Sequence, residues 1–547
     1  MQLLKRNLAY YWRTNLAVVA GVATAVAVLA GALLVGDSVR ASLRDLFLQR
    51  LGNTDHVVTA TGFFRAQLAA DIQSSPQFAS SGFSSAAPLI ALEGTITHEA
   101  SGRRGLNVRV YGIDERFWTF HGLKNHGPVN REILVGDALA RELGSGAGDA
   151  LLLRVEKPSE IPVESLHSRK EDLGRTLRLT TREVLSTEAL GEFSVQPQQS
   201  AVRAVFVPLK LLQRELEQEG KANLILIGEA VRDQREPKTE LLGRIVDEVA
   251  TIDDFGIKLR LVPEESSISL ESDSKLVNDQ LAATADVAAK KASLRSFPVL
   301  SYLANRIASS HSSIPYSLVT ALDEETFERL KQGKASTPEL NVGEANRNAD
   351  GEKQRKEHIT EPSFVSALSP IVLNDWAARD LGVRPGDLIT IDYYYWRENG
   401  ELETRTAQFR LASIVAIAGM AADKDLVPDY PGITSSPSLS DWDPPFPIDL
   451  GLVRPQDEDY WKQYRTTPKA FIPLAKGQEL WQSRFGRLTS IRIVSPSGPE
   501  IRRVLDVFGA ALRGAMSAES MGFRIIPARR QGLEASRGAT NFGEYFL

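Results

Sequence analysis

Cysteine is absent from this chain of 547 residues, and histidine and methionine are scarce, with seven and four copies. The lack of cysteine excludes disulfides, thiolate metal sites and thiol redox chemistry, so stability has to come from hydrophobic cores. The few histidines are scattered. His121 and His126 flank the turn HGLKNH, whose spacing is not that of a metal site. We therefore expect no metal ligands.

Charge of one sign is also lacking. Charged residues make up 24% of the chain and the formal net charge is −5, which argues against a nucleic-acid partner. The length exceeds that of one ordinary core, so two or more folded units are expected.

The familiar catalytic motifs are missing as well. The chain contains no GxxxxGK[ST] loop, no HExxH and no GxSxG. The acidic pairs Asp253/Asp254 and Glu264/Glu265 are adjacent in sequence, so their side chains point to different faces and fit solvated loops better than acid–base catalysis. We predict that the chain is not an enzyme, and we assign it no catalytic, cofactor-binding or metal-binding residue.

One long apolar run is present. Leu16–Val35 carries no charge, and Thr24 is its one polar side chain. As a helix it would be roughly 30 Å long, the thickness of the hydrocarbon core of a bilayer. Apolar residues continue on one helical face to Leu51. The pattern predicts one helix that spans a membrane at about 16–36, continues as a stalk and ends near Gly52.

The flanks of the run predict its orientation. Lys5, Arg6 and Arg13 precede it, with no acidic residue before Asp37, so the amino terminus is expected in the cytoplasm and the bulk of the chain outside it. A cleaved signal peptide is disfavoured because the run exceeds the usual h-region of about 7–15 residues. A buried core helix is disfavoured for the same reason of length. Small residues recur every four positions, which favours partner helices over a solitary anchor.

A repeat is visible within the remaining chain. Residues 133–149 (ILVGDALARELGSGAGD) recur as residues 371–387 (IVLNDWAARDLGVRPGD). Each copy reads as a strand, a capped helix of two turns, a left-handed glycine and a Gly-Asp turn into a second strand. The predicted caps are Asp137 and Asp375, and the predicted terminal glycines are Gly144 and Gly382.

The repeat also argues against two candidate sites. The glycines of 144–148 imitate a nucleotide-binding turn, but the second copy keeps only the first and last of them, so a plain turn is predicted. The motif Asp137–Arg141 recurs as Asp375–Arg379, and we interpret both as salt bridges on a helix surface.

Further matches extend the repeat. VFVPL (205–209) resembles FIPL (471–474), NLILI (223–227) resembles SIRIV (490–494), and GIKLRLVP resembles GFRIIP. We therefore predict an α+β fold, with one N-terminal transmembrane helix and stalk followed by two related mixed modules. The predicted parts are 1–52 (cytoplasmic stub, membrane helix and stalk), 53–275 (first module), 276–540 (second module) and 541–547 (start of a second membrane helix).

Two insertions distinguish the second copy. Residues 341–360 are polar and almost free of apolar side chains, which is typical of a loop without fixed structure. Residues 425–455 are rich in proline and aromatic residues. They form either a docking surface for a partner or a loop packed on its own module.

The signal-anchor helix, the stalk GDSVRASLRDLFLQRLG and the pattern VGDALARELGSGAGD resemble the FtsX-like permease family of ATP-binding-cassette transporters, with a MacB-like periplasmic core domain. The resemblance implies a bacterial inner-membrane permease without cofactors, or the N-terminal part of one. It also implies a cytoplasmic ATPase partner, a homodimer or paired permease, lipid contact, and a periplasmic or outer-membrane partner or lipoprotein substrate. ATP hydrolysis would then move the periplasmic domain. The alternative is a single-anchor periplasmic scaffold or binding protein without an ATPase.

Overall fold

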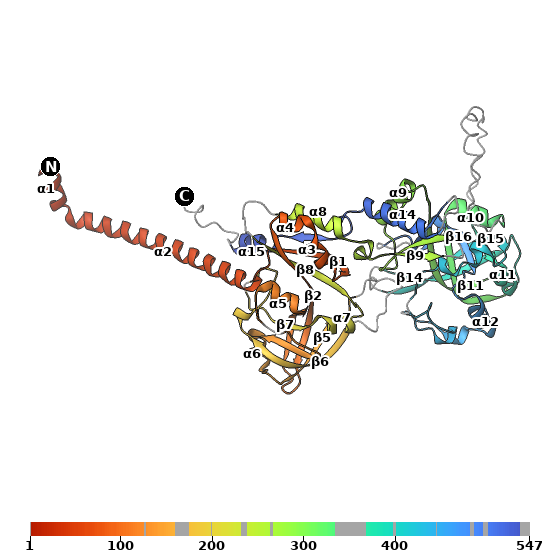
Figure 1. The fold of residues 1–547 in the computed structure, drawn as a ribbon, viewed down its shortest axis with the longest axis horizontal. Coiled ribbons are helices and arrows are strands. Elements are labelled where there is room, and N and C mark those ends of the chain that lie inside the picture. Colours follow the sequence, from red (N-terminus) through yellow and green to blue (C-terminus); the bar gives the residue numbers. More distant parts are fainter. Residues whose placement is uncertain are drawn as a thin grey trace, which may run out of the picture. The chain divides into compact units, whose positions relative to one another are not determined.

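The computed structural model contains one long N-terminal helix and two compact units (Figure 1). Unit 1 takes the residues up to Glu156, Gly174–Ala250 and the residues from Gly522 on, whereas Thr251–Met521 form unit 2. The structure describes residues 2–124, 127–158, 174–198, 200–230, 238–262, 266–333, 368–397, 401–430, 432–444, 446–481, 486–495 and 501–536.

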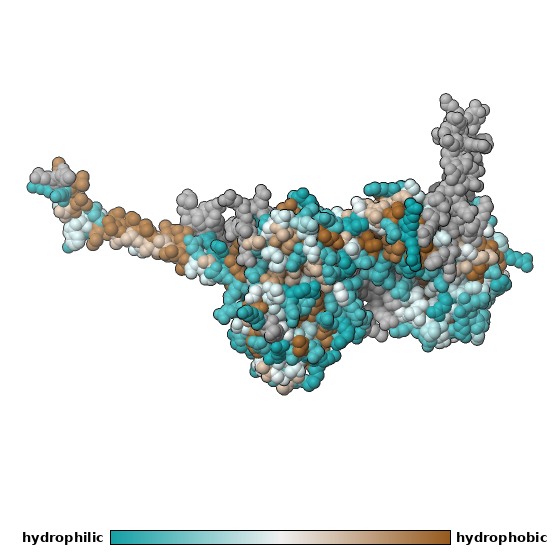
Figure 2. Space-filling model, viewed as in Figure 1, coloured by the Kyte–Doolittle hydropathy of each residue, from teal (hydrophilic) through white to brown (hydrophobic). Residues whose placement is uncertain are grey.

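The N-terminal helix confirms the predicted stalk. After the short helix α1 (Gln2–Tyr10), helix α2 runs without a break from Trp12 to Leu51, and its backbone turns at Gly52, where φ is +60°. Of the described helices, α2 is the one long and apolar enough to cross a membrane. Figure 2 shows its apolar surface along most of its length. Length and composition therefore agree with the membrane-spanning interpretation.

Unit 1 is built on a sheet of nine strands, of which β2 is the longest and pairs with three others. The strands of this sheet are β1 (His56–Arg65), β2 (Phe83–His98), β3 (Arg104–Ile113), β4 (Glu132–Gly136), β5 (Ala150–Glu156), β6 (Gly174–Leu185), β7 (Ala204–Pro208), β8 (Lys221–Glu229) and β18 (Arg524–Ile526).

The strand order in unit 1 is β18-β1-β8-β2-β3-β7-β4-β6-β5, and β2 also pairs with β5. That pairing closes a barrel from β2 to β5, while β8, β1 and β18 extend the sheet beside it. Alternating apolar residues such as Ile96, Val108 and Leu153 fill the barrel. The helices of unit 1 are α3 (Leu68–Ser74), α4 (Pro76–Ser80), α5 (Glu115–His121), α6 (Asp137–Leu143), η1 (Thr187–Ala189), α7 (Leu209–Glu215), α8 (Thr239–Val249) and α15 (Ala528–Ser536).

Unit 2 is a second nine-stranded sheet with the same plan. Its strands are β9 (Ile257–Val262), β10 (Ser267–Ser272), β11 (Arg295–Ala308), β12 (Ser313–Leu322), β13 (Ser369–Asn374), β14 (Leu388–Trp396), β15 (Leu402–Val415), β16 (Ala470–Pro473) and β17 (Ser490–Val494). Here β11 takes the place of β2: it pairs with β12 and β14 to close the barrel, and with β17 to extend the sheet as β17-β10-β9.

The helices described in unit 2 lie between these strands, and α9, α10, α11, α13 and α14 follow the strands equivalent to those before α3, α5, α6, α7 and α8 of unit 1. The described helices of unit 2 are η2 (Ile252–Phe255), α9 (Asp279–Lys291), α10 (Glu324–Lys331), α11 (Asp375–Leu381), η4 (Gly419–Ala422), η5 (Lys424–Leu426), η6 (Leu439–Asp441), η7 (Leu450–Leu452), α12 (Pro455–Tyr464), α13 (Leu474–Trp481) and α14 (Ile501–Ala515). The predicted α+β fold with two related modules is confirmed.

Local geometry confirms the repeat and corrects its caps. Gly144 and Gly382 both end their helices in the left-handed conformation, with φ of +65°. The caps lie one residue earlier than predicted. The side chain of Asn374 accepts a hydrogen bond from the backbone N–H of Ala377, whereas Gly136 caps α6 without a side chain. A Cβ at Gly136 would lie 2.0 Å from the carbonyl oxygen of Gly191, which excludes asparagine there.

The outermost strands are exchanged between the two copies. β9 follows α8 of the first copy along the chain, yet it pairs with β10 in unit 2. β18 follows α14 of the second copy and pairs with β1 in unit 1. The compact units therefore divide the chain differently from the predicted module boundaries, which describe the repeat along the sequence and stay a prediction.

Several predictions fall on particular segments. The loop at 341–360, the residues Glu264, Glu265 and His126, and the predicted helix at 541–547 lie outside the described residues. The segment 425–455 packs on its own unit, because Tyr430, Trp442 and Phe446 are buried in an apolar cluster with strands β11 and β12. That result confirms the second of the two interpretations offered for this segment.

Candidate functional site at the base of the long helix

The end of α2 is held in unit 1 by a buried ion pair. Arg50 is only 4% exposed, and its guanidinium donates to Glu192 through Nε, at 2.9 Å, and through Nη2. Its Nη1 also donates to the carbonyl oxygen of Gln198 at 2.8 Å. The backbone N–H of Ser194 bonds back to the Arg50 carbonyl oxygen. The last turn of the helix is therefore tied to the loop that follows η1.

Apolar contacts surround that pair. Phe47 and Leu51 enter the cluster formed by β1, β2, β3 and β8, where they meet Phe117 and Leu226 among others. Leu51 is fully buried. Full burial of a side chain of this kind contributes about 1.5–3 kcal/mol, so the base of the helix is part of the core of unit 1.

A tight turn follows the helix. The backbone N–H of Asn53 donates to Nδ1 of His121 at 3.1 Å, and the Asn53 amide donates to the carbonyl oxygen of Phe120. A Cβ at Gly52 would lie 2.5 Å from the same His121 nitrogen, so this turn requires glycine. Burial lowers the pKa of His121 to about 3, which keeps its ring neutral and able to accept the bond.

The C-terminal helix α15 completes the joint. Arg529 donates to the carboxylate of Asp55 and to the carbonyl oxygen of Gly52. Gly532 faces Phe47 so closely that a Cβ there would lie 1.9 Å from the ring. In Figure 1, α15 lies beside the base of α2. Segments 474 positions apart in the sequence, those of Asp55 and Arg529, therefore meet at one joint.

The base of α2 is held in unit 1 by contacts of three kinds. The helix is continuous through the apolar segment, and its end is fixed by an ion pair, a buried cluster and a second helix. The sequence analysis predicted the stalk but not Arg50, Glu192 or Arg529, because their burial depends on partners far along the chain.

Of the residues considered from sequence, those that the structure describes do not come together as a site. Asp254 is buried and accepts hydrogen bonds from the backbone and hydroxyl of Thr251, while Asp253 is exposed. The Asp137–Arg141 and Asp375–Arg379 pairs are exposed salt bridges at 2.9 and 3.0 Å. Within the described residues, no group of three or more potential metal ligands is found.

One constellation that sequence reasoning missed imitates a catalytic triad. Nδ1 of His98 lies 2.8 Å from Oγ of Ser101, and its Nε2 lies 3.5 Å from Asp149. However, the Ser101 hydroxyl faces the terminal carbonyl oxygen of α6, and Ser309 of unit 2 makes the same bond to the last residue of α11. His311, beside Ser309, is exposed. The repeated role of the serine is thus to hold a helix end.

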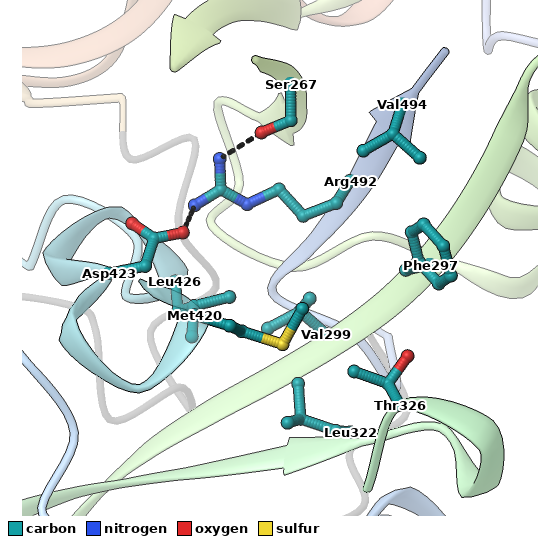
Figure 3. Close-up of a pocket in the computed structure, with 10 residues that line it drawn as sticks. All are labelled: Ser267, Phe297, Val299, Leu322, Thr326, Met420, Asp423, Leu426, Arg492 and Val494. Carbon is teal, nitrogen blue, oxygen red and sulfur yellow. Dashed lines mark hydrogen bonds and ion pairs between the residues drawn. The ribbon is translucent and has the colours of Figure 1, made fainter. Parts of the chain in front are cut away.

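A second buried ion pair lies in unit 2 (Figure 3). Arg492 of β17 donates to Asp423 at 2.8 Å and faces Ser267, among apolar side chains such as Val299. Burial raises the pKa of the Asp423 carboxyl, although Arg492 opposes the effect. The cavity beside it measures about 20 Å³, room for about one water molecule. The two charged side chains are paired with each other at this place.

Residues 16–235 match the family model described as the MacB-like periplasmic core domain. The chain therefore contains a domain of this family, which begins in α2 and covers most of unit 1. The apolar helix and the periplasmic domain together indicate a membrane-anchored chain with its bulk outside the cytoplasm. No curated protein matches the chain.

Three solved structures are similar at low identity. They are the periplasmic region of MacB from Actinobacillus actinomycetemcomitans (13% identity, 36% of this chain and 87% of that chain, TM-score 0.22), the extracellular domain of the noncanonic ABC-type transporter YknZ from Gram-positive bacteria (11%, 36% and 94%, 0.23) and a domain of a putative permease protein from Porphyromonas gingivalis (16%, 37% and 84%, 0.23). Because these scores are low, the family assignment rests on the match of residues 16–235 alone.

Proposed function

We propose that the chain is the permease subunit, or the N-terminal part of one, of an ATP-binding-cassette export or mechanotransmission system. Its role would be to couple ATP hydrolysis in the cytoplasm to movement of the domain outside. The observation that carries the proposal is the uninterrupted helix α2, whose far end is locked into unit 1 by Arg50, Phe47 and Leu51. The MacB-like periplasmic core domain supports the same role.

The proposed topology and partners rest on the same features. The cationic residues before the apolar segment favour a cytoplasmic amino terminus in a bacterial inner membrane. An ATPase subunit would act there, on a homodimer or a paired permease. A periplasmic or outer-membrane partner, or a lipoprotein substrate, would meet the domain outside. No chemical step at a residue of this chain is part of the proposal.

The absence of cysteine makes the test direct, because an introduced cysteine is a unique label. The tagged chain is purified from its native membrane with whatever ATPase accompanies it, and a spin label is placed on the exposed Val129 of unit 1. We expect the distances between labels on paired copies to change when ATP is added. Leu43→Pro should abolish that change, because proline removes a helical hydrogen bond and kinks α2.

Leu43→Ala is the matched control, since it shortens the same side chain and leaves the helix intact. It should retain the ATP-dependent change, and both variants should retain the ATPase. If no ATPase accompanies the chain and ATP leaves the distances unaltered, the permease function is wrong and the scaffold or binding-protein function replaces it. If Leu43→Pro responds like the parent protein, the helix does not transmit the motion.

A further inference from the structure

Unit 1 contains a cavity of about 230 Å³ at the point where β2 leaves β8 and joins β5. Its walls include Ala91 and Glu93 of β2, Arg109 of β3, Asn223 of β8 and Gln196 of the loop between β6 and β7. Pockets that hold cofactors or drug-sized ligands usually measure about 300–1,000 Å³. The size of this cavity is therefore closer to that of a single large side chain.

We call this point, where a long strand leaves one partner strand and joins another, the fork of the sheet. Unit 2 has the same fork. In unit 1 the side chain of Asn223 takes the place of a strand: its Oδ1 accepts from the Ala91 N–H at 2.8 Å. In unit 2 the hydroxyl of Thr489 accepts from the Ser301 N–H at 3.0 Å. Ala91 and Ser301 occupy the same place in β2 and β11, next to the pairs Ile90–Gly112 and Leu300–Ala321. The two forks are equivalent positions.

The fork in unit 2 is filled by a segment of the chain itself. The Tyr430 hydroxyl donates to the Ser301 carbonyl oxygen at 2.8 Å, and the Ser301 hydroxyl donates to the Leu426 carbonyl oxygen at 2.8 Å. Tyr430 is 3% exposed and packs in a cluster with Leu303 and Leu318. This occupant is the part of the connection around Leu426 and Tyr430, and it presents one large aromatic side chain.

The connecting loops explain why only one fork is filled. The connection from β15 to β16 spans residues 416–469 and supplies Tyr430, whereas the connection from β6 to β7 spans only 186–203. The wall differs in character too. The pair Leu303–Leu318 of unit 2 corresponds to Glu93–Arg109 in unit 1, an ion pair at 2.6 Å whose side chains are 61% and 30% exposed.

We propose that the cavity of unit 1 binds an extended segment of a partner polypeptide, which places one large aromatic side chain against Ala91 as Tyr430 is placed in unit 2. The Arg109–Glu93 pair and the exposed Gln196 amide lie at the rim and supply hydrogen bonds to the backbone of that segment. Because this rim is polar, it suits a peptide that binds reversibly better than an apolar loop that stays packed. The proposal needs no ATPase, so it stands or falls separately from the permease function.

The first experiment measures binding of a fluorescent peptide with the sequence of residues 424–432, KDLVPDYPG, to the full chain in detergent. We expect saturable binding, and a loss of at least tenfold in affinity when alanine replaces the tyrosine of the peptide. Gln196→Trp, which fills the cavity from its rim, should reduce binding by a similar factor. Gln67→Trp adds the same side chain at an exposed position outside the cavity wall and should leave binding unchanged.

A second variant covers the case in which Gln196→Trp disturbs the loop. Ala91→Leu enlarges a side chain on the strand itself and should weaken binding in the same way. A photoreactive group in place of the peptide tyrosine should cross-link to residues 91–93, 109 or 194–196. Cross-links to Ser301 or Thr320 of unit 2, or no binding at millimolar peptide, would overturn the proposal.

Discussion

The two units share one sheet but differ in what covers it. Leu226 of β8 lies opposite Val57 in unit 1, and at the matching place Arg492 of β17 lies opposite Ser269 in unit 2. In unit 1 this face receives the base of the long helix, so an apolar residue suits it. In unit 2 it receives the turns η4 and η5, and Arg492 meets Asp423 there.

Both faces nevertheless bury one arginine beside one carboxylate. In unit 1 the arginine comes from the helix that arrives, Arg50, and in unit 2 it comes from the sheet, Arg492. A buried pair contributes little net stability, but the loss of one partner is costly because the remaining charge is uncompensated. The repeat therefore preserves the order of strands in the sheet. The segment that docks on each sheet face determines which residues the sheet carries under it.

The largest expected change in stability comes from substitutions that break these two ion pairs one at a time. Glu192→Ala should destabilise unit 1, and Asp423→Ala unit 2, each by about 3–5 kcal/mol, because each leaves a buried guanidinium unpaired. Hydrogen exchange resolved by peptide, during urea unfolding of the full chain, separates the two units. Equal destabilisation of both units by either substitution would contradict their independence at these faces.

The matched control removes both charges of one pair. Arg50→Met combined with Glu192→Leu should recover most of the stability lost in Glu192→Ala, because no charge is then left buried. A double variant as unstable as Glu192→Ala would instead show that the pair has a role other than mutual neutralisation.

The next largest effect concerns the contact between α15 and the long helix, which has no equivalent in unit 2. Gly532→Ala should cost about 1–3 kcal/mol, because the added Cβ would overlap the Phe47 ring. This loss of stability should be measurable as faster hydrogen exchange in α15. Phe47→Ala makes room for the methyl group, so in the double variant the added cost of Gly532→Ala should largely vanish. An unchanged cost there would place the strain elsewhere.

The smallest expected effect is a dependence of the stability of unit 1 on pH. The pKa of His121 is about 3 when folded and about 6.5 when unfolded, so between these values the unfolded state binds more protons. Unit 1 should lose up to about 1.4 kcal/mol per pH unit as pH falls from about 6.5 towards 3.

Urea unfolding at pH 7 and pH 5, followed by hydrogen exchange, measures this slope in unit 1 and compares it with unit 2. His121→Asn keeps an acceptor for the Asn53 N–H but does not titrate, so it should flatten the slope of unit 1 and leave unit 2 unchanged. A slope that persists in His121→Asn would assign the effect to another group.

Much of the frame was predictable from local sequence, with an error of one residue in places. Helix α2 ends where Gly52 was expected to end it, and Gly144 and Gly382 are left-handed as predicted. The match of residues 223–227 to 490–494 is shifted by one, because the hydrogen bonds equate Asn223 with Thr489. Apolar alternation identifies strands well, but it specifies register only once a partner strand is present.

The joint itself was not predictable. Arg50 and Glu192 are ordinary charged residues in the sequence, and their burial depends on a contact between positions 142 apart. The exchange of β9 and β18 likewise has no local signal, since an edge strand reads the same whichever sheet it joins. The fork cavity of unit 1 became visible only beside the filled fork of unit 2.

Local patterns in the chain specify the long apolar helix, its end at glycine and the duplicated α+β plan, and the lack of cysteine excludes thiol chemistry. Those features depend on side-chain periodicity and backbone preference over a few neighbouring residues, which any stretch of chain carries with it. Tertiary structure alone decided which strand closes which sheet, which charges are buried, and which fork stays open. These outcomes depend on contacts between distant segments, where burial and pairing are gained only after the chain has folded.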